Sequence, residues 1–502
     1  MVRVLTVAGL LACLASGCAS GGSSVGKEAA ADEIKKGGFT VAASCHDPQI
    51  LREGDTYYMF GSHMVGAKCQ DLRKWNYFAN GVDAANTLFD NLLTEPYAAF
   101  DFVGKNTDNG YSVWASNVIY NETMKKYVMY FCTTSSYVKS TLCFATADSI
   151  EGPYTYVDTI LYSGYGKSNI SETNLYDVLG KNADISRYLE YGGYNNKEWP
   201  NCIDPAIFTD ADGRMWMNYG SWSGGIFLLE IDPATGYPIY PVDDKDADPY
   251  YGYRLIGGGH HSAEGPYIQY DAENGYYYLF VSYGDLQSDG GYQIRQFRSE
   301  KPTGPYVDVA GNTLEDQDDH FNYGLKMMGN YTFPSLNYTY MAPGGQSTFQ
   351  DDDGKYYITY HQRFDDGTEY HEPRVHQMYT NEDGWFVAAP FATMGETLSE
   401  KGYKKSDVSG TFYVVNHGTD ISSKIREAEA YTFADGKVTG GEKSGTYEVK
   451  EGTDYITITL DGVVYKGVLM EMTDEAENPV FCFSAAGDNE ETLWGVQYIK
   501  KE

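Results

Sequence analysis

Short runs of alternating hydrophobic and polar residues recur along the chain up to about residue 400, and each run follows an acidic or glycine-containing turn. Five of these segments begin 61 to 89 residues apart, at Glu53, Asn121, Asp210, Asp271 and Asp351. An apolar segment precedes each turn, so each repeat is predicted to open with a β-hairpin in which Gly or Asn supplies the positive φ. Four antiparallel strands repeated five times are typical of a five-bladed β-propeller. Repeated β-sandwich domains are the alternative interpretation.

Each repeat is longer than a minimal blade. We therefore expect the segments 79–112, 163–200 and 310–342 to form loops over one end of the propeller, where they would shape a binding cleft. After about residue 403 the pattern changes to alternating strands with a different spacing. The chain is thus predicted to be all-β, with a propeller over 38–403 and a small C-terminal β-barrel or sandwich over 404–502.

Composition narrows the possible partners. The chain has 502 residues, with 37 Lys and Arg against 70 Asp and Glu, so its formal charge is −33. A surface this acidic repels phosphate backbones and anionic lipid headgroups, which argues against a nucleic-acid partner and against direct membrane binding. The 47 Tyr and 55 Gly suit many short strands and tight turns. A neutral or cationic ligand fits better, and we expect a monomer.

The first 18 residues have the pattern of a secretory signal. Arg3 precedes an apolar stretch of eleven residues, which is too short to span a bilayer. The stretch leads into Ala15-Ser-Gly-Cys18, which resembles a bacterial lipoprotein signal in which Cys18 becomes the acylated first residue. We expect a secreted or cell-surface lipoprotein with residues 19–37 as a flexible tether. Cleavage without lipid attachment is the alternative.

Six further cysteines follow Cys18. They are too sparse for a disulfide scaffold, and no CxxC pair suggests a zinc site. A bridge between Cys132 and Cys143 across a hairpin is one possibility, and buried free thiols are the other.

Three acidic residues stand directly before first strands of different repeats. They are Asp47 in Cys-His-Asp-Pro-Gln-Ile, Asp204 in Cys-Ile-Asp-Pro-Ala-Ile-Phe and Glu264 in Ser-Ala-Glu-Gly-Pro-Tyr-Ile. The innermost strands of a propeller converge on its axis, so carboxylates at the same end of three blades would meet at the mouth of the central channel. The proline that follows Asp47 and Asp204, or the Gly-Pro pair that follows Glu264, fixes the local backbone and directs the side chain. Turn-initiating Asp-Pro pairs without chemistry are the alternative.

These three motifs, in this order and on these repeats, resemble glycoside hydrolase family 43 over residues 39 to 400. The resemblance implies a five-bladed propeller that hydrolyses arabinose- and xylose-containing plant polysaccharides with inversion at the anomeric carbon. It implies Asp47 as the general base, Glu264 as the general acid, and Asp204 as the group that orients the acid and raises its pKa. Inverting hydrolysis requires one carboxylate to activate water and a protonated carboxyl on the opposite side of the sugar.

Within that family, the first-repeat motif Ser44-Cys-His-Asp-Pro and the C-terminal module resemble two-domain bacterial endo-α-1,5-L-arabinanases. This implies arabinan, a side chain of pectic polysaccharides, as the substrate. The residues expected to contact substrate are Trp114, Asn201, Ser221 and Trp222. An aromatic face suits the apolar face of a sugar ring. Trp222, beside two glycines, is favoured as a subsite, whereas Trp114 suits a sugar platform and the propeller core equally.

His361 ends the second strand of the fifth repeat and should point toward the axis. A lone histidine is an unusual ligand for hard Ca²⁺, so the residues alone favour a core histidine. The resemblance implies instead one calcium ion held by His361 near the catalytic carboxylates, and no organic cofactor. The acidic run at Asp351 lacks the ligand spacing of an EF-hand and is interpreted as a solvated hairpin turn.

Two other functions stay open at this stage. An exo-acting β-xylosidase or α-L-arabinofuranosidase of the same family would differ in having one end of its groove closed by loops. A non-catalytic, glycan-binding propeller would bind arabinan without cleaving it.

Overall fold

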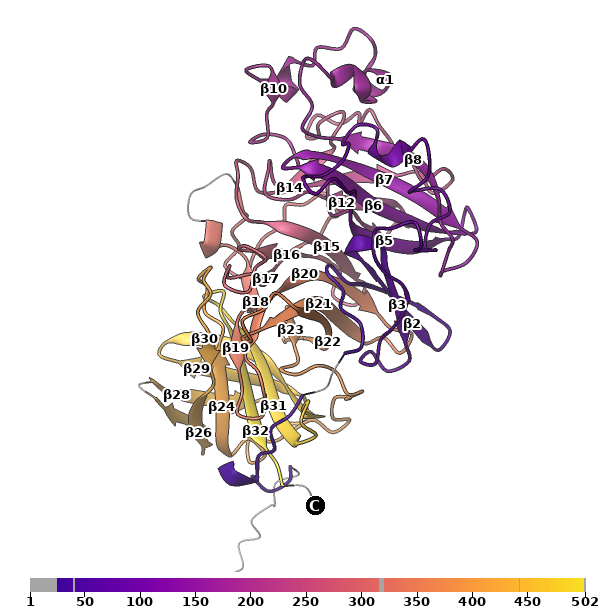
Figure 1. Ribbon diagram of the computed structural model, residues 1–502. Helices are drawn as coiled ribbons and strands as arrows, with labels where there is room; N and C mark the ends of the chain where they lie inside the picture. Colours follow the sequence, from indigo (N-terminus) through magenta and orange to yellow (C-terminus); the bar gives the residue numbers. More distant parts are fainter. Residues whose placement is uncertain (1–24, 39–40, 316–319, 442, 501–502) are drawn as a thin grey trace, which may run out of the picture.

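The computed structural model describes residues 25–500 except 39–40, 316–319 and 442. Five β-sheets surround a common axis and form a propeller, and a closed β-barrel built from the C-terminal residues lies at one end of the molecule (Figure 1). The predicted fold class is confirmed. Within the described ranges, no helix is both long and apolar enough to cross a bilayer. The signal-peptide prediction for 1–18 falls outside these ranges.

Each blade is an antiparallel sheet whose strands follow one another in sequence order. Blade 1 contains β1 (Gln49–Glu53), β2 (Thr56–Gly61), β3 (Val65–Cys69) and β4 (Asn76–Ala79). Blade 2 contains β5 (Ser112–Asn121), β6 (Lys126–Ser136), β7 (Lys139–Ala147) and β8 (Thr155–Tyr162). Blade 3 contains β11 (Ala206–Thr209), β12 (Met215–Tyr219), β13 (Ile226–Ile231) and β14 (Tyr253–Ile256). Blade 4 contains β15 (Glu264–Asp271), β16 (Tyr276–Tyr283), β17 (Gln293–Ser299) and β18 (Leu325–Met328). Blade 5 contains β20 (Tyr340–Gln350), β21 (Tyr356–Phe364), β22 (His371–Thr380) and β23 (Phe386–Ala388).

The five predicted hairpins are all present, as the pairs β1–β2, β5–β6, β11–β12, β15–β16 and β20–β21. Four of the turns contain the expected glycine with positive φ, at Gly54, Gly213, Gly275 and Gly354. The turn of blade 2 differs from the prediction, because Lys125 adopts the positive φ (54°) there. The insertion between blades 2 and 3 contains the short helix α1 (Leu175–Leu179) and the strands β9 (Leu189–Glu190) and β10 (Gly193–Tyr194).

A left-handed residue marks the point where each blade meets the central channel. These residues are Asp47 (φ 53°), Ala115 (48°), Asp204 (58°), Gly265 (57°) and Gly345 (57°). Each one and the two residues that follow it line a narrow cavity on the axis, so every blade contributes one tripeptide. The five positions are therefore structurally equivalent, and Glu264 stands one residue before this position in blade 4.

The ring closes through side chains of blades 1 and 5. Asp351, in the β20–β21 turn, pairs with the guanidinium of Arg52 and accepts a hydrogen bond of 2.6 Å from the Tyr57 hydroxyl. Ser347 donates to the Pro48 carbonyl at 2.8 Å. The acidic run forms the expected solvated hairpin turn, with Asp352 85% and Asp353 53% exposed, but the side chain of Asp351 itself is only 7% exposed. Its carboxylate instead joins the last blade to the first.

The C-terminal barrel is closed by eight antiparallel strands. They are β24 (Gly410–Asn416), β26 (Glu429–Ala434), β27 (Lys437–Gly440), β28 (Lys443–Val449), β29 (Tyr455–Leu460), β30 (Val463–Thr473), β31 (Pro479–Gly487) and β32 (Thr492–Tyr498). The segment between β24 and β26 returns to the propeller. There β25 (Arg426–Glu427) pairs in parallel with β19 (Tyr331–Thr332), which lies beside β20. β25 thus belongs to the sheet of blade 5, and one hydrophobic core spans both sides of the expected boundary at 403/404, since Phe386 of blade 5 clusters with Met470 and Trp494 of the barrel.

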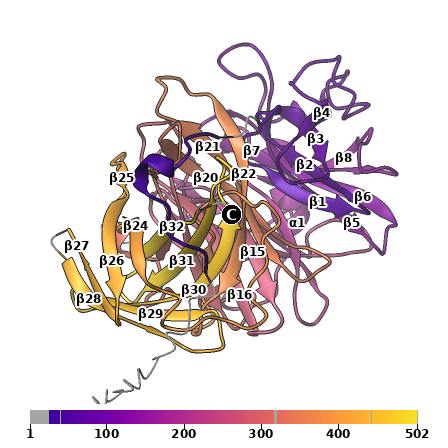
Figure 2. The same cartoon turned by 90° about the horizontal axis from the view of Figure 1, so that it is seen from below.

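Residues 25–37, expected to be part of a flexible tether, lie along the barrel. Ala29 donates its amide to the Tyr498 carbonyl, and Lys500 donates to the Lys27 carbonyl. Figure 2 shows this N-terminal segment beside β32. The tether interpretation was wrong for these residues, because their backbone groups extend the edge of the barrel.

The cysteines that the structure describes are all buried and free. In the β6–β7 ladder Cys132 faces Leu142, while Cys143 faces Phe131. The two thiols are thus offset by one residue, and the buried-thiol alternative holds.

Candidate active site

The structure brings Asp47, Asp204 and Glu264 together at the mouth of the channel. Asp47 and Asp204 directly precede the first strands of blades 1 and 3, and Glu264 is the first residue of β15. The Asp204 Oδ2 atom accepts a hydrogen bond of 3.1 Å from the amide of Gly265, the residue after Glu264. Asp can adopt a left-handed backbone at small cost, which is what the channel position requires.

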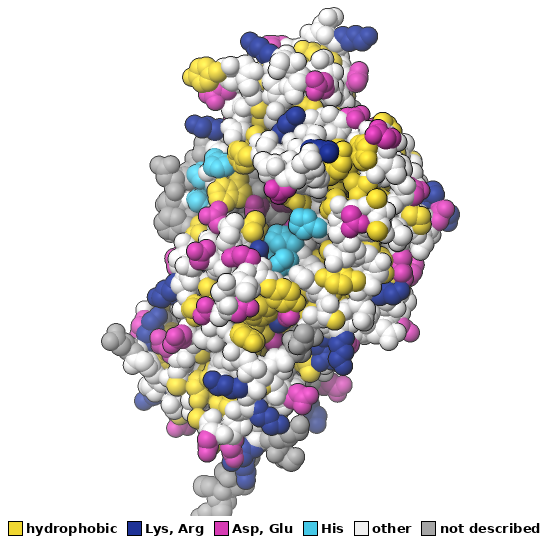
Figure 3. Space-filling view, viewed as in Figure 1, with side chains coloured by type: hydrophobic (Ala, Val, Ile, Leu, Met, Phe, Trp, Pro, Cys, Tyr) yellow, Lys and Arg dark blue, Asp and Glu magenta, His cyan; other side chains and the backbone are white. Residues whose placement is uncertain are grey.

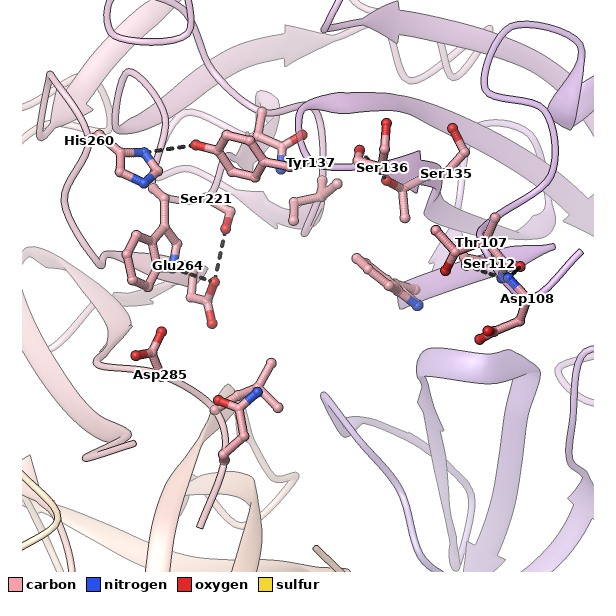
Figure 4. A pocket seen from close by; sticks show the side chains of 18 of the residues that line it. Thr107, Asp108, Ser112, Ser135, Ser136, Tyr137, Ser221, His260, Glu264 and Asp285 are labelled. Carbon is pink, nitrogen blue, oxygen red and sulfur yellow. Dashed lines mark hydrogen bonds between the residues drawn. The ribbon is translucent and has the colours of Figure 1, made fainter. Parts of the chain in front are cut away.

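Three donors hold the Glu264 carboxyl. The Tyr292 hydroxyl donates to Oε1 at 2.7 Å, while the Ser221 hydroxyl and the Trp222 indole N–H each donate to Oε2 at 2.9 Å. Figure 4 shows the Ser221 bond at the wall of the cleft. Burial raises the pKa of Glu264 above its ordinary value, and the three hydrogen bonds offset only part of this rise. Glu264 is thereby suited to carry a proton at a higher pH than an exposed glutamate.

Asp47 has the opposite electrostatic preference. His46 Nδ1 lies 2.8 Å from its Oδ2, and the Ser62 hydroxyl donates to the same oxygen at 2.5 Å. Burial alone would raise the pKa of Asp47, but His46 and Ser62 outweigh it and lower the pKa. Ser62 is itself oriented by the Ala115 amide, which donates to its oxygen at 2.9 Å. Asp47 is thus held in its ionised form.

Of the three carboxyls, Asp204 has the pKa that is shifted most strongly. Burial raises its pKa well above the ordinary value, and the charges of Asp47 and Glu264 raise it further. By the same repulsion, a charge on Asp204 would disfavour ionisation of Glu264. The three groups are therefore coupled, and a proton added to one favours ionisation of the others.

A stack of three rings connects the two ends of the site. His46 stacks on His361 with ring centroids 4.0 Å apart, and His361 stacks on Tyr292 at 5.6 Å. Because His46 contacts Asp47 and Tyr292 contacts Glu264, the stack fixes the two carboxyls relative to each other.

A cleft of about 630 Å³ opens beside Glu264. Its wall includes the four residues expected to contact substrate, namely Trp114, Asn201, Ser221 and Trp222. Trp114 also packs on the propeller core, as one of its two interpretations predicts, and its role as a sugar platform stays a prediction. Trp222 lines the cleft with its ring, and its indole N–H also donates a hydrogen bond to Glu264. At the rim, Tyr137 bonds to His260 Nδ1 at 2.8 Å (Figure 4), and His260 packs against Trp222.

The surroundings of His361 fit a cation. The ring is fully buried, and neither of its nitrogens has a hydrogen-bond partner. Its Nδ1 lies 4.0 Å from Asp47 Oδ1, and ligand atoms of His46, Asp47 and His361 all lie within 4.8 Å of one another. A side chain at Gly345 would collide with Asp47 and the His361 ring, so the glycine keeps this space open. Two imidazoles and one carboxylate suit a borderline metal as well as calcium, which would need further oxygen ligands such as water.

Sequence reasoning missed four residues of this centre: His46, Ser62, Tyr292 and Gly345. His46 lies within the motif Ser44-Cys-His-Asp-Pro, directly before Asp47, so its position in the sequence could have indicated it. Tyr292 follows Gly290-Gly291 at the start of a third strand, and no spacing rule connects that position to Glu264.

Comparison with known proteins agrees with this geometry. The model for glycosyl hydrolases family 43 matches residues 178–386, and a C-terminal lipocalin-like domain model matches 390–495. The extracellular endo-α-(1→5)-L-arabinanase 2 of Bacillus subtilis is 38% identical over 467 residues, covering 90% of this chain and 92% of that protein. The chain belongs to glycosyl hydrolase family 43.

Other members of family 43 match almost as extensively. The extracellular endo-α-(1→5)-L-arabinanase of Thermotoga petrophila is 36% identical, over 91% of this chain and 94% of that protein. The crystal structure of endo-1,5-α-L-arabinanase from Thermotoga petrophila RKU-1 superposes with a TM-score of 0.79 and 35% identity, covering 93% of this chain and 100% of that one. A family 43 protein from Bacillus licheniformis gives a TM-score of 0.80 and 36% identity, over 92% and 99% of the two chains. These relatives share both domains with this chain.

Proposed function

We propose that the protein is an inverting glycoside hydrolase that cleaves internal α-1,5-L-arabinofuranosyl linkages of arabinan. Asp47 accepts a proton from the attacking water, and Glu264 donates a proton to the departing sugar oxygen. Asp204 acts through Glu264: its bond to the Gly265 amide holds the backbone beside the acid, and when Asp204 is ionised its charge disfavours ionisation of Glu264. The bond from water to the anomeric carbon forms on the face opposite the leaving group, so the configuration inverts.

The observation that carries this proposal is the contrast between two partly buried carboxyls at one channel mouth. The environment lowers the pKa of Asp47 and raises that of Glu264. Two titratable groups whose pKa values are pushed apart are the expected signature of a base and an acid. The arabinan specificity is supported by the relatives that share both domains, which are named as endo-arabinanases.

Hydrolysis of linear α-1,5-arabinan tests the proposal, with xylan in parallel. We expect a rapid loss of viscosity with a ladder of oligosaccharides, and proton NMR of the first products should show the β-anomer. Monosaccharide release at nearly constant viscosity would instead indicate the exo-acting alternative. Binding without cleavage of either polymer would favour the glycan-binding propeller.

The hydrogen bond from Ser221 to Glu264 leads to a prediction about the pH dependence of activity. Because the Ser221 hydroxyl lowers the pKa of Glu264, Ser221→Ala should raise that pKa. The reaction needs protonated Glu264, so activity is lost as pH rises through this pKa. The alkaline limb of the kcat/KM profile should therefore move to higher pH in Ser221→Ala. An alkaline limb that stays in place or moves to lower pH would contradict the role of Glu264 as the acid.

We also propose that His361, with Asp47 and His46, holds a divalent cation, and calcium is the ion that the family resemblance favours. When bound, the cation supplies positive charge that stabilises the ionised Asp47 carboxylate. Protein treated with EDTA and dialysed should lose turnover, and Ca²⁺ should restore it. Calorimetric titration should detect Ca²⁺ binding to the dialysed protein but not to its His361→Ala variant. Binding that persists in this variant would contradict the proposed site.

Export to the cell exterior completes the proposal. Two relatives that match most of the chain are named as extracellular. The first 18 residues have a signal-like pattern, and Cys18 is the proposed point of acylation. Mass spectrometry of the mature N-terminal peptide, with Cys18→Ala as the control, distinguishes a lipid anchor from plain secretion.

A further inference from the structure

A second pocket of about 380 Å³ opens on blade 5, where β20 and β22 begin and β21 ends. None of the roles proposed above involves it. Its lining includes Asn337, Tyr338, Phe364, Tyr370, Glu372 and Arg374. The large cleft beside Glu264, by contrast, is lined by residues from blades 2, 3 and 4 and their loops. The second pocket therefore lies outside the space already assigned to the reacting sugars.

The pocket combines exposed aromatic rings with a buried ion pair. Tyr338 is 58% exposed and Tyr370 is 46% exposed. In the interior, Arg374 donates to Glu372 at 2.9 Å, and its guanidinium lies 5.4 Å from the centre of the Phe364 ring. Arg374 and Glu372 are both more than nine-tenths buried. Their charges compensate each other, so the pocket offers directional polar groups without a net charge from this pair.

These features select a neutral, polyhydroxylated ligand. Aromatic faces pack on the apolar faces of sugar rings, and a small number of fixed polar groups orient the hydroxyls. A phosphorylated or carboxylated ligand is disfavoured by the formal charge of −33. The acidic side chain of Asp366, which also lines the pocket, likewise disfavours a phosphorylated or carboxylated ligand.

The pocket lies next to the catalytic centre. Tyr370 is followed by His371, whose ring packs edge-on against His46 at 5.2 Å and against His361 at 5.8 Å. His46 in turn contacts Asp47. Figure 3 shows histidines in a hollow on one face of the molecule, with hydrophobic side chains gathered directly below them. A polymer bound at Asp47 can thus continue along blade 5 without leaving this face.

We propose that the pocket bounded by Tyr338, Phe364 and Tyr370 binds furanosyl units of the arabinan chain beyond the catalytic subsites. The inference rests on the proposed function for the identity of the sugar. It assigns to blade 5 a distal site that retains the polymer between cleavage events. Short oligosaccharides occupy only the catalytic subsites, so the distal site does not increase their affinity.

Binding to soluble linear arabinan tests the site directly. In the inactive Glu264→Gln background, the pair Tyr338→Ala and Tyr370→Ala should weaken binding about tenfold in affinity electrophoresis, because two stacking contacts are lost. The pair Tyr338→Phe and Tyr370→Phe keeps both rings and should retain most of the affinity. Tyr191→Ala is the matched control, since Tyr191 is fully exposed on a distant turn. Unchanged affinity in the double alanine variant would overturn the proposal.

Catalysis gives a second readout. In the active protein, the double alanine variant should lose several-fold in kcat/KM on polymeric arabinan but keep its rate on arabinotriose. An equal loss on both substrates would overturn the distal site, because it would place the tyrosines at the catalytic subsites. The proposed function fails separately, if the unaltered protein does not cleave arabinan. In that case the electrophoresis still shows whether Tyr338 and Tyr370 bind the polymer.

Discussion

The Glu264→Gln variant is expected to lose nearly all turnover of arabinan, by about 10³-fold or more. Glutamine keeps the shape of the side chain and can accept the same donors from Tyr292, Ser221 and Trp222. It has no carboxyl proton to give to the leaving sugar oxygen. The loss should therefore appear in kcat, with substrate binding largely retained. Reducing-sugar release from linear arabinan, measured over a range of concentrations, separates the two parameters.

The leaving group distinguishes an acid from a structural residue. An aryl arabino-oligosaccharide whose phenolate departs without protonation should be cleaved by Glu264→Gln far better than the polymer is, relative to the unaltered protein. Glu273→Gln, on the exposed turn of the same blade, is the matched control and should keep full activity. If both substrates lose activity equally, or if appreciable polymer turnover remains, Glu264 is not the general acid.

Replacement of the general base should lower turnover as strongly as replacement of the general acid. Asp47→Asn should lower turnover of arabinan by about 10³-fold, because an amide cannot accept the proton of the attacking water. Unlike Glu264→Gln, this variant should be equally slow on polymer and on substrates with an activated leaving group. Sodium azide should restore part of the activity, since azide attacks the anomeric carbon without a base while Glu264 still protonates the leaving oxygen. The product is then a glycosyl azide of inverted configuration, which mass spectrometry and NMR detect.

Asp55→Asn, in the exposed β1–β2 turn, controls for the loss of one carboxylate from blade 1. It should leave activity unchanged with or without azide. Turnover by Asp47→Asn that azide does not raise, in a variant that still binds arabinan, would count against Asp47 as the base.

The sequence predicted the propeller because hairpins with alternating residues are local features that repeat. The same locality made Asp47, Asp204 and Glu264 visible, since all three stand where a first strand begins, Asp47 and Asp204 before a proline and Glu264 before a Gly-Pro pair. The channel geometry then explains the choice of residue. The innermost position of each blade has a left-handed backbone, which Asp and Gly adopt more readily than most residues. Glu264 does not need a left-handed backbone, because the next residue, Gly265, occupies the left-handed position in blade 4.

The residues that sequence reasoning missed act through contacts between different strands or different blades. Tyr292 reaches Glu264 from the residue before β17, His46 stacks on His361 from another blade, and Ser62 bonds to Asp47 from the residue after β2. Each of these contacts depends on side-chain packing between segments that are not consecutive in the chain. The role of Asp351 was missed for the same reason, because its partners Arg52 and Tyr57 lie almost 300 residues earlier. Local patterns predict elements, but they do not show which elements meet.

The return of residues 417–428 to the propeller has a consequence for the modularity of the protein. Asp420 offers its carbonyl to Lys326 at 2.8 Å and to Gln293 at 3.0 Å, and Arg295 donates to the Thr419 carbonyl. All three donor side chains are buried. A chain that ended at residue 403 would remove these acceptor carbonyls from three buried donors and would expose the edge of β19. The two domains of this chain therefore share buried hydrogen bonds, and each stabilises the other.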